Sequence, residues 1–187
     1  MNPKLFEDEL ISLANIEPDI DAEIESKWSH DTEYLRMNAA ESSHPLSTAQ
    51  LNKRCKSLEK KTEDRTRLFY FTIRKQEDNC LVVFIRIELM DWNHRTASLQ
   101  HGIGNAADRG QGFGTQALNL MLHYAFTELN LHRVTLDVFE YNPRAVRSPE
   151  KAGFVVEGHE RKTLHRDGNY WDVIFMGVLR EEWEIHR

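Results

Sequence analysis

The chain has 187 residues, of which 40% are hydrophobic and 29% are charged, proportions typical of a globular rather than a disordered protein. The length suits one domain with a buried core, so we expect residues 1–187 to form a single domain. The formal net charge of -6 argues against a nucleic-acid partner, because phosphates attract clusters of lysine and arginine, and it favours a cationic small molecule or a basic peptide.

The sequence contains no segment that predicts export or membrane insertion. The longest apolar runs, such as residues 81–85, are too short to span a bilayer, and residues 1–8 lack the basic start and apolar stretch of a signal peptide. We therefore expect a cytoplasmic protein with no membrane partner. The two cysteines, Cys55 and Cys80, have neither CxxC spacing nor a histidine at metal-binding distance, so we expect free thiols and no metal site.

The first third of the chain predicts one short strand followed by helices. Residues 10–13 form a short alternating run, as a strand does. Residues 19–28 begin with acidic side chains, which a helix N-terminus prefers. Residues 47–61 begin with a capping candidate, Ser47 or Thr48, and continue through good helix formers, so we expect another helix there.

The segment that follows the first predicted helix, residues 28–34, is acidic and aromatic and has two interpretations. In the first, Asp31 and Glu33 belong to a solvated helix face. In the second, they form the wall of a site for a cationic substrate, since carboxylates attract ammonium groups. The sequence favours the first interpretation.

The pattern changes to strands after residue 67. Residues 68–73 are aromatic and β-branched, and residues 81–89 are almost continuously apolar, which is typical of a central strand. Residues 96–103 form a third strand. Turns at residues 78–79 and 91–95 are short, so we expect these three strands to form an antiparallel meander.

A loop with four glycines, residues 104–114, follows the third strand and opens directly into a helix. The helix has apolar residues on one face because they recur at helical spacing. These residues are Leu118, Met121, Leu122, Ala125 and Leu129.

The last third predicts a strand, a helix and a hairpin. Residues 133–139 alternate as a strand, and residues 143–152 begin with a proline and end before a glycine, as a helix does. Residues 154–157 and 170–179 form the last two strands, with a turn at residues 165–169. The element order predicts an α/β fold with a single mixed sheet and helices on both faces.

The glycine loop predicts a site for a pyrophosphate. Backbone N–H groups converge where a glycine-rich turn enters a helix, and the helix dipole adds partial positive charge. Arg109 adds a forked cation and Thr115 adds a hydroxyl in the first turn. A nucleotide-hydrolase P-loop is excluded, because the loop has no lysine.

A dinucleotide site is the second alternative for this loop. Residues 112–117 match the pattern GxGxxA, and Asp137 lies about 20 residues further on, where that fingerprint has an acidic residue. However, Asp137 falls inside the next strand rather than at its end, and the remaining chain is too short for a doubly wound sheet. Coenzyme A is the third alternative.

Two motifs favour coenzyme A. The run Arg109-Gly110-Gln111-Gly112-Phe113-Gly114 resembles the R/Q-x-x-G-x-G/A motif of the GNAT superfamily of N-acetyltransferases. The run NPRAVRSPEKAGF at residues 142–154 is similar to the family's second signature, an Asn-x-x-Ala segment that ends in Glu-Lys-x-Gly-Phe. The resemblance covers residues 68–179 and is nearest to the branch of ribosomal-protein and spermidine N-acetyltransferases. It implies a GNAT-type α/β fold with a mixed, mostly antiparallel sheet.

The resemblance also implies a set of cofactor contacts. Backbone groups near Ile103 and Gly104 would pair with the pantetheine arm, and the loop would hold the pyrophosphate. Asn142 would hydrogen-bond the cofactor, and Lys151 would lie near its phosphates. The residues implied to bind coenzyme A are Ile103, Gly104, Arg109, Gly110, Gln111, Gly112, Phe113, Gly114, Thr115, Asn142 and Lys151.

The catalytic groups do not follow from the resemblance. Relatives often use a tyrosine of the second signature to protonate the leaving thiolate, but this chain has Pro149 there, and proline has no proton to donate. Many relatives place a base early in the third strand, where this chain has Ser98. Glu88 and His101 are the candidates instead, and a base that acts through water stays open.

By this resemblance the chain is expected to be an enzyme, an N-acetyltransferase that moves an acetyl group from acetyl-CoA to a primary amine. The amine would belong to a small polyamine-like molecule or to a protein or peptide N-terminus, and a homodimer is consistent with the family. The alternatives are a CoA-binding regulatory protein with degenerate catalysis and a dinucleotide-binding oxidoreductase.

Overall fold

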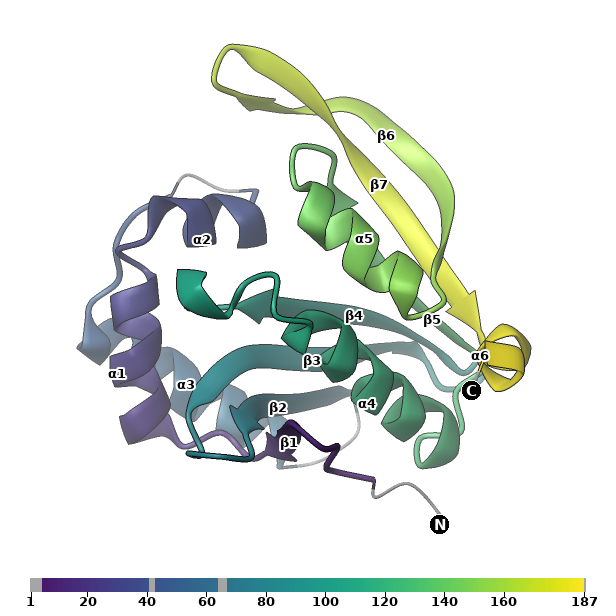
Figure 1. Cartoon of the computed structure of the whole chain (residues 1–187), viewed down its shortest axis with the longest axis horizontal. Coiled ribbons are helices and arrows are strands. Elements are labelled where there is room, and N and C mark those ends of the chain that lie inside the picture. Colours follow the sequence, from purple (N-terminus) through teal and green to yellow (C-terminus); the bar gives the residue numbers. More distant parts are fainter. Residues whose placement is uncertain (1–4, 41–42, 64–66, 187) are drawn as a thin grey trace.

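The computed structural model describes residues 5–40, 43–63 and 67–186. In the described residues seven strands form one sheet, and helices flank it (Figure 1). The strands are β1 (Ile11–Ala14), β2 (Leu68–Lys75), β3 (Leu81–Asp91), β4 (Thr96–Ile103), β5 (Arg133–Phe139), β6 (Val155–Arg166) and β7 (Asn169–Leu179). The helices are α1 (Pro18–Trp28), α2 (Thr32–Asn38), α3 (Thr48–Thr62), α4 (Phe113–Thr127), α5 (Pro143–Lys151) and α6 (Arg180–His186), with a 3-10 turn, η1 (Ala106–Asp108).

The strand order is β1-β2-β3-β4-β5-β7-β6. All neighbouring strands pair antiparallel except β4 and β5, which are parallel. The expected mixed, mostly antiparallel sheet is confirmed, as is the meander of β2, β3 and β4. The single parallel pair forms because η1 and α4 carry the chain back across the sheet between β4 and β5.

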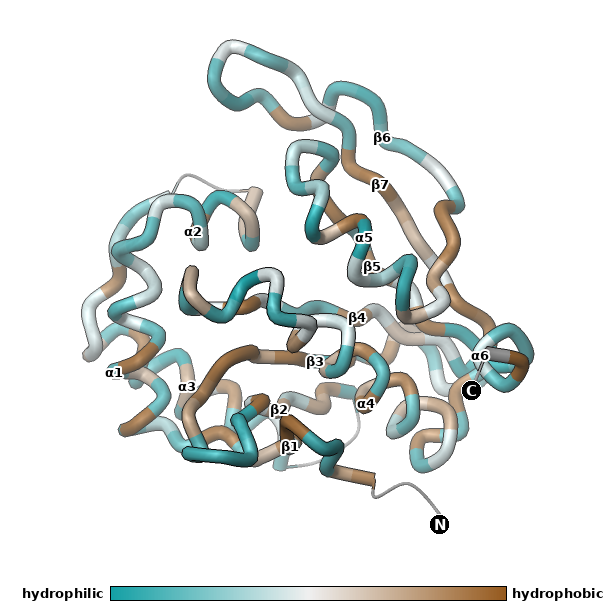
Figure 2. Tube along the Cα trace, viewed as in Figure 1, coloured by the Kyte–Doolittle hydropathy of each residue, from teal (hydrophilic) through white to brown (hydrophobic). Residues whose placement is uncertain are grey.

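Helices cover both faces of the sheet, as expected. The buried side chains of α4 pack with those of β1 to β5 into the main core, and residues of α5 complete it. On the opposite face α3 packs on β2 through Leu51, Cys55 and Leu58, and α1 lies beside α3. Figure 2 shows hydrophobic residues along the central strands and a mostly hydrophilic tip on the β6–β7 hairpin, which extends beyond the helices.

Two helices and part of one strand differ from the sequence prediction. The helix α2 begins at the N-cap Asp31, whose side chain accepts a hydrogen bond from the backbone N–H of Glu33. The sequence predicted no element after the strand at residues 170–179, but the helix α6 follows β7 directly. Trp183 on α6 packs beside Phe126 of the core. The strand β6 runs to Arg166 rather than to residue 157, because its pairing with β7 continues past two register shifts.

Among the described residues no helix is long and apolar enough to cross a membrane. The same residues contain no group of three or more histidine, cysteine or acidic side chains arranged to hold a metal ion. Cys55 is buried and Cys80 is exposed, and both are free thiols.

Candidate active site

A cavity of about 380 Å³ lies in the gap between β4 and β5. The two strands pair only from Thr96 to Ser98 and from Arg133 to Thr135, and they diverge beyond that point. Residues 99–103 of β4 and 136–139 of β5 line the gap, together with residues of α2, the glycine loop and α5. The two strands therefore separate near the centre of the sheet, and residues from both faces of the sheet line the cavity.

The free edge of β4 offers backbone groups to this cavity. The N–H of Gly104 donates to the carbonyl of Val82 at 3.0 Å, so Gly104 and alternate residues before it face β3. The backbone groups of Ile103 and His101 consequently point away from β3, toward the gap. An extended ligand can pair with this edge as an added strand does.

Gly104 itself is engaged elsewhere. Its carbonyl accepts a hydrogen bond from Arg109 at 2.8 Å, and its N–H is used by β3. A Cβ at this position would lie 1.9 Å from the ring of Trp28, which explains the glycine. The structure therefore leaves Ile103 available for the pantetheine pairing that the resemblance implies, and gives Gly104 a packing role.

The N-terminus of α4 has the backbone geometry that an anion site requires. Gly112 is its N-cap with φ 91°, no side chain caps its first N–H groups, and Gly110 also has a positive φ of 78°. A Cβ on either glycine would meet no atom within 4 Å, so the loop is open above the helix end. Uncapped N–H groups at the start of a 15-residue helix attract a phosphate.

The two residues next to Gly112, Gln111 and Phe113, do not line the cavity. Phe113 packs against the main core, and Lys75 lies 5.5 Å from its ring centre. Gln111 is exposed and does not line the cavity. Of the loop residues implied to bind the pyrophosphate, the cavity is lined by Arg109, Gly110, Gly112, Gly114 and Thr115.

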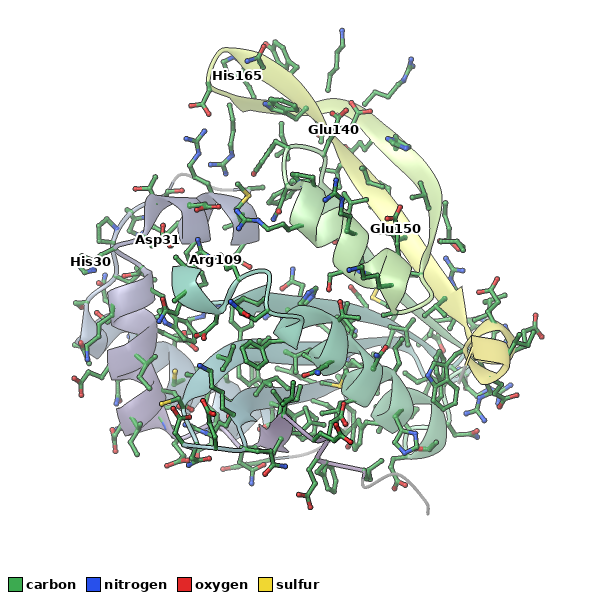
Figure 3. All side chains as sticks on the ribbon, viewed as in Figure 1. His30, Asp31, Arg109, Glu140, Glu150 and His165 are labelled. Carbon is green, nitrogen blue, oxygen red and sulfur yellow. The ribbon has the colours of Figure 1, made fainter. Side chains whose placement is uncertain are left out.

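Arg109 forms ion pairs with α2. Its guanidinium lies 2.6 Å from a carboxylate oxygen of Asp31 and 3.1 Å from one of Glu33, and Figure 3 shows Arg109 beside Asp31. Arg144 of α5 also pairs with Glu33. The pKa of the Asp31 carboxyl is lowered, because hydrogen bonds and the charge of Arg109 outweigh the effect of burial. Arg109 therefore links α2 to the glycine loop, and both segments line the cavity.

The helix α5 brings two further cations to the cavity. Arg147 and Lys151 lie one helical turn apart and both line the cavity, and in the described part of the chain neither forms an ion pair. Asn142 also lines the cavity, but its side chain accepts a hydrogen bond from the N–H of Ala145 and caps α5. Ser148 lies 3.1 Å from Thr115, oxygen to oxygen, which ties α5 to the start of α4.

Pro149 and Tyr141 provide no proton donor to the cavity. Pro149 is buried in the last turn of α5 and has no N–H or hydroxyl. The hydroxyl of Tyr141 donates to the carbonyl of Arg36 at 2.6 Å, and so holds the end of α2.

The two candidate bases lie in different places. Glu88 is exposed on β3, where it is paired in register with Leu68 and Ser98, and it does not line the cavity. His101 lines the cavity on the α4 side, because a Cβ added to Gly114 would lie 3.9 Å from its Nε2 atom. Burial lowers the pKa of His101 to about 4, so its imidazole is neutral at pH 7.

Two residues that line the cavity, Arg147 and Asp137, were not among the predicted coenzyme A or catalytic residues. The spacing of Arg147 and Lys151, four residues apart on a predicted helix, was a signal that both share one face. Asp137 was considered only for a dinucleotide site, and it lies in this cavity.

Coenzyme A fits this donor set. The free edge of β4 suits an extended chain with amide groups, the N-terminus of α4 suits a pyrophosphate, and Arg147 and Lys151 supply unpaired positive charge on the same side. A doubly wound dinucleotide fold does not fit, since only one pair of strands in the sheet is parallel.

Comparison with known proteins gives the same result. Residues 11–155 match the domain family described as Acetyltransferase (GNAT) domain. Spermidine N(1)-acetyltransferase of Vibrio cholerae is 35% identical over 113 residues, which are 60% of this chain and 64% of that protein. The putative ribosomal N-acetyltransferase YdaF of Bacillus subtilis is 32% identical over 107 residues, 57% of this chain and 58% of that protein. The chain thus matches less than two thirds of the length of these curated relatives.

Solved structures resemble the chain over almost its whole length. The crystal structure of spermidine N-acetyltransferase from Vibrio cholerae in complex with CoA and spermine has a TM-score of 0.78 and 26% identity, covering 95% of this chain and 99% of that chain. The crystal structure of a probable acetyltransferase has a TM-score of 0.81 and 25% identity, covering 96% and 97%. The motifs, the fold and the family match agree, and the chain belongs to the GNAT acetyltransferase family.

Proposed function

We propose that the chain is an enzyme that transfers an acetyl group from acetyl-CoA to a primary amine. The observation that carries this proposal is the two-sided cavity between β4 and β5. One side presents the α4 N-terminus, Arg147 and Lys151, which suit phosphates. The other side presents α2 and the carboxylate of Asp137, which suits an ammonium group. A thioester carbon in the gap is within reach of an amine from the opposite face.

Each part of the cavity has a task in this reaction. The α4 N-terminus and the α5 cations hold the phosphates, and the backbone edge at Ile103 orients the pantetheine arm along β4. Bringing the two reactants together in one geometry replaces a bimolecular encounter and supplies a large part of the rate acceleration. The amine has to lose a proton before it attacks, because an alkyl ammonium has a pKa of about 10.4.

The departing thiolate does not require a side-chain acid. Pro149 occupies the position where relatives carry a tyrosine, and neither Tyr141 nor His101 can replace it at neutral pH. A thiol has a pKa of about 8.5, so the thiolate is a tolerable leaving group that water protonates after departure. We therefore expect turnover without a dedicated general acid.

The acceptor is either a small polyamine-like molecule or a protein or peptide N-terminus. The Vibrio cholerae relatives named spermidine acetyltransferases favour the first class, and the net charge of -6 is compatible with both. We place the protein in the cytoplasm, and we propose a homodimer by analogy with the family.

A CoA-binding regulatory protein is the second candidate function, and Pro149 is the observation that favours it. The two functions are separated by measuring thiol release from acetyl-CoA with a panel of amines that includes spermidine and basic peptide N-termini. Amine-dependent thiol release is the result expected of the enzyme. Tight CoA binding without thiol release across the panel would favour the regulatory protein.

A further inference from the structure

The carboxylate of Asp137 lies on the acceptor side of the sheet. Asp137 alternates along β5 with Leu136 and Val138, whose side chains join the core beneath α4. Neighbouring side chains on a strand point to opposite faces, so Asp137 points to the face from which α2 reaches the cavity. Its position is just past Thr135, the last residue of β5 that pairs with β4. Asp137 thus stands where the gap opens.

Asp137 has no partner among the described residues other than its own backbone N–H. On the same face, Gln100 is occupied by a hydrogen bond from Arg86, and Phe175, the cross-strand neighbour of Asp137, is apolar. Loss of surrounding water raises the pKa of the Asp137 carboxyl above its ordinary range, although the side chain is open to the cavity. A carboxylate of this kind is a stronger base than one in water.

The other acidic groups near the cavity are already committed or lie elsewhere. Glu33 is bound by both Arg109 and Arg144, so its charge is neutralised in place. Glu88 is exposed on β3 outside the cavity lining. Among the described residues that line the cavity, Asp137 is therefore the carboxylate that forms no ion pair.

The remaining titratable and charged groups that line the cavity do not compete for the amine proton. Tyr34 of α2 is buried, which raises its pKa, and a neutral phenol is a poor base. His101 lies on the α4 side, and its pKa of about 4 makes it a weak base. Arg147 and Lys151 belong to α5, on the same side as α4, and are cations.

We propose that Asp137 is a catalytic residue that accepts the proton of the substrate ammonium, an inference that rests on the proposed function above. The carboxylate takes one proton from the ammonium, and the freed nitrogen lone pair forms a bond to the thioester carbon. The C–S bond then breaks with its electron pair on sulfur. The second nitrogen proton ends on that sulfur through water, and Asp137 returns its proton to solvent. The products are the amide, the free thiol and one released proton.

Asp137→Asn keeps the shape of the side chain and removes its basicity. We expect kcat/KM at pH 7 to fall about 100-fold or more, the range typical of a lost general base. The deficit should shrink as the pH approaches about 10.4, because solution then supplies the neutral amine that the variant cannot make. Asp137→Glu should recover part of the rate. The matched control is Glu128→Gln, an exposed carboxylate at the end of α4 that is expected to change nothing.

Calorimetric titration supplies a measurement that does not depend on turnover. CoA should bind Asp137→Asn within about twofold of wild type, since Asp137 lies on the face opposite α4 and α5. Spermidine titrated into the CoA complex should bind the variant at least fivefold more weakly, because the ammonium has lost its counter-charge. Loss of CoA affinity in the variant would mean that the substitution disturbs the fold of the cavity, and the assignment would then be wrong.

A wrong role for Asp137 can be distinguished from a wrong proposed function. If the wild-type protein turns over and Asp137→Asn matches it in rate and in pH profile, the role of Asp137 is refuted while the proposed function stands. If neither protein releases thiol with any amine of the panel, the proposed function fails and the proton-transfer step fails with it.

Discussion

The substitution Gly112→Asp tests the anion site at the start of α4. Gly112 has φ 91°, and a Cβ atom added at this position would have no atom within 4 Å, so an aspartate fits without a clash. The new carboxylate would lie against the N–H groups that a pyrophosphate needs, and it would also repel that pyrophosphate. A left-handed conformation costs a non-glycine residue about 1–2 kcal/mol, which lowers stability separately from affinity.

The effect on affinity is estimated from the charge interaction. Two unit charges about 4 Å apart interact by about 4 kcal/mol near a protein surface, and the openness of this loop to solvent reduces that to about 2–3 kcal/mol. The dissociation constant for CoA should therefore rise roughly 30- to 150-fold, since about 1.4 kcal/mol corresponds to tenfold. Isothermal titration calorimetry with CoA at low ionic strength measures this change, which should diminish when salt is added.

Two controls separate charge from backbone strain. Gly112→Asn has nearly the same shape and strain but no charge, so its affinity should fall much less than that of the aspartate variant. Gly168→Asp, on the β6–β7 turn with φ 74° and equally open space, should cost similar stability and leave CoA affinity unchanged. Equal CoA affinity in the aspartate and asparagine variants at Gly112 would refute the assignment of the pyrophosphate to this helix end.

Three further predictions concern stability and reactivity. Asp21→Ala should reduce the free energy of unfolding by about 2–3 kcal/mol in urea titrations, because the buried Arg74 loses the carboxylate 2.5 Å away and keeps the half-exposed Glu17 at 3.4 Å, so the loss is below the about 3–5 kcal/mol of a fully unpaired buried charge. Burial lowers the pKa of His101 to about 4 in the folded protein, so the unfolded chain binds more protons between about pH 6.5 and 4. The free energy of unfolding therefore falls as the pH falls through that window. His101→Gln should reduce the loss between about pH 7.5 and 5 by up to about 2 kcal/mol. A thiol reagent should label the exposed Cys80 in the native protein, and should label Cys55, whose burial raises its pKa to about 12, only after unfolding. A loss of less than about 1 kcal/mol in Asp21→Ala would contradict the structure. So would an unchanged dependence of stability on pH in His101→Gln, or rapid labelling of both Cys55 and Cys80 in the native protein.

The core strands and the glycine loop were predictable because their signals are local. The apolar run of β3 reflects burial on both faces, and the glycines of the loop are required by positive φ at Gly110 and Gly112. By contrast, β6 is almost entirely exposed, so no alternation of apolar side chains marked its full length. The helix α2 spans seven residues and has one buried side chain, Tyr34, which gives no recognisable period.

The sequence predicted only those parts of the candidate site that come from one continuous segment of the chain. The partners of Arg109 lie 76 and 78 residues earlier in the chain, so the ion pairs that fasten α2 to the loop have no local signal. The role proposed for Asp137 depends on the divergence of β4 from β5 after Thr135, which is a property of the sheet. Pro149 was visible in the sequence, and the structure adds that the hydroxyl of Tyr141 is engaged by the carbonyl of Arg36.

Transfer of an acetyl group to an amine by this protein can be tested directly with one measurement. The wild-type protein is incubated with acetyl-CoA and spermidine or a basic peptide, thiol release is followed, and the amine product is analysed by mass spectrometry. We predict equal amounts of free thiol and of a product that carries one acetyl group, formed only when protein and amine are both present. CoA binding without any acetylated amine across the panel would contradict acetyl transfer by this protein.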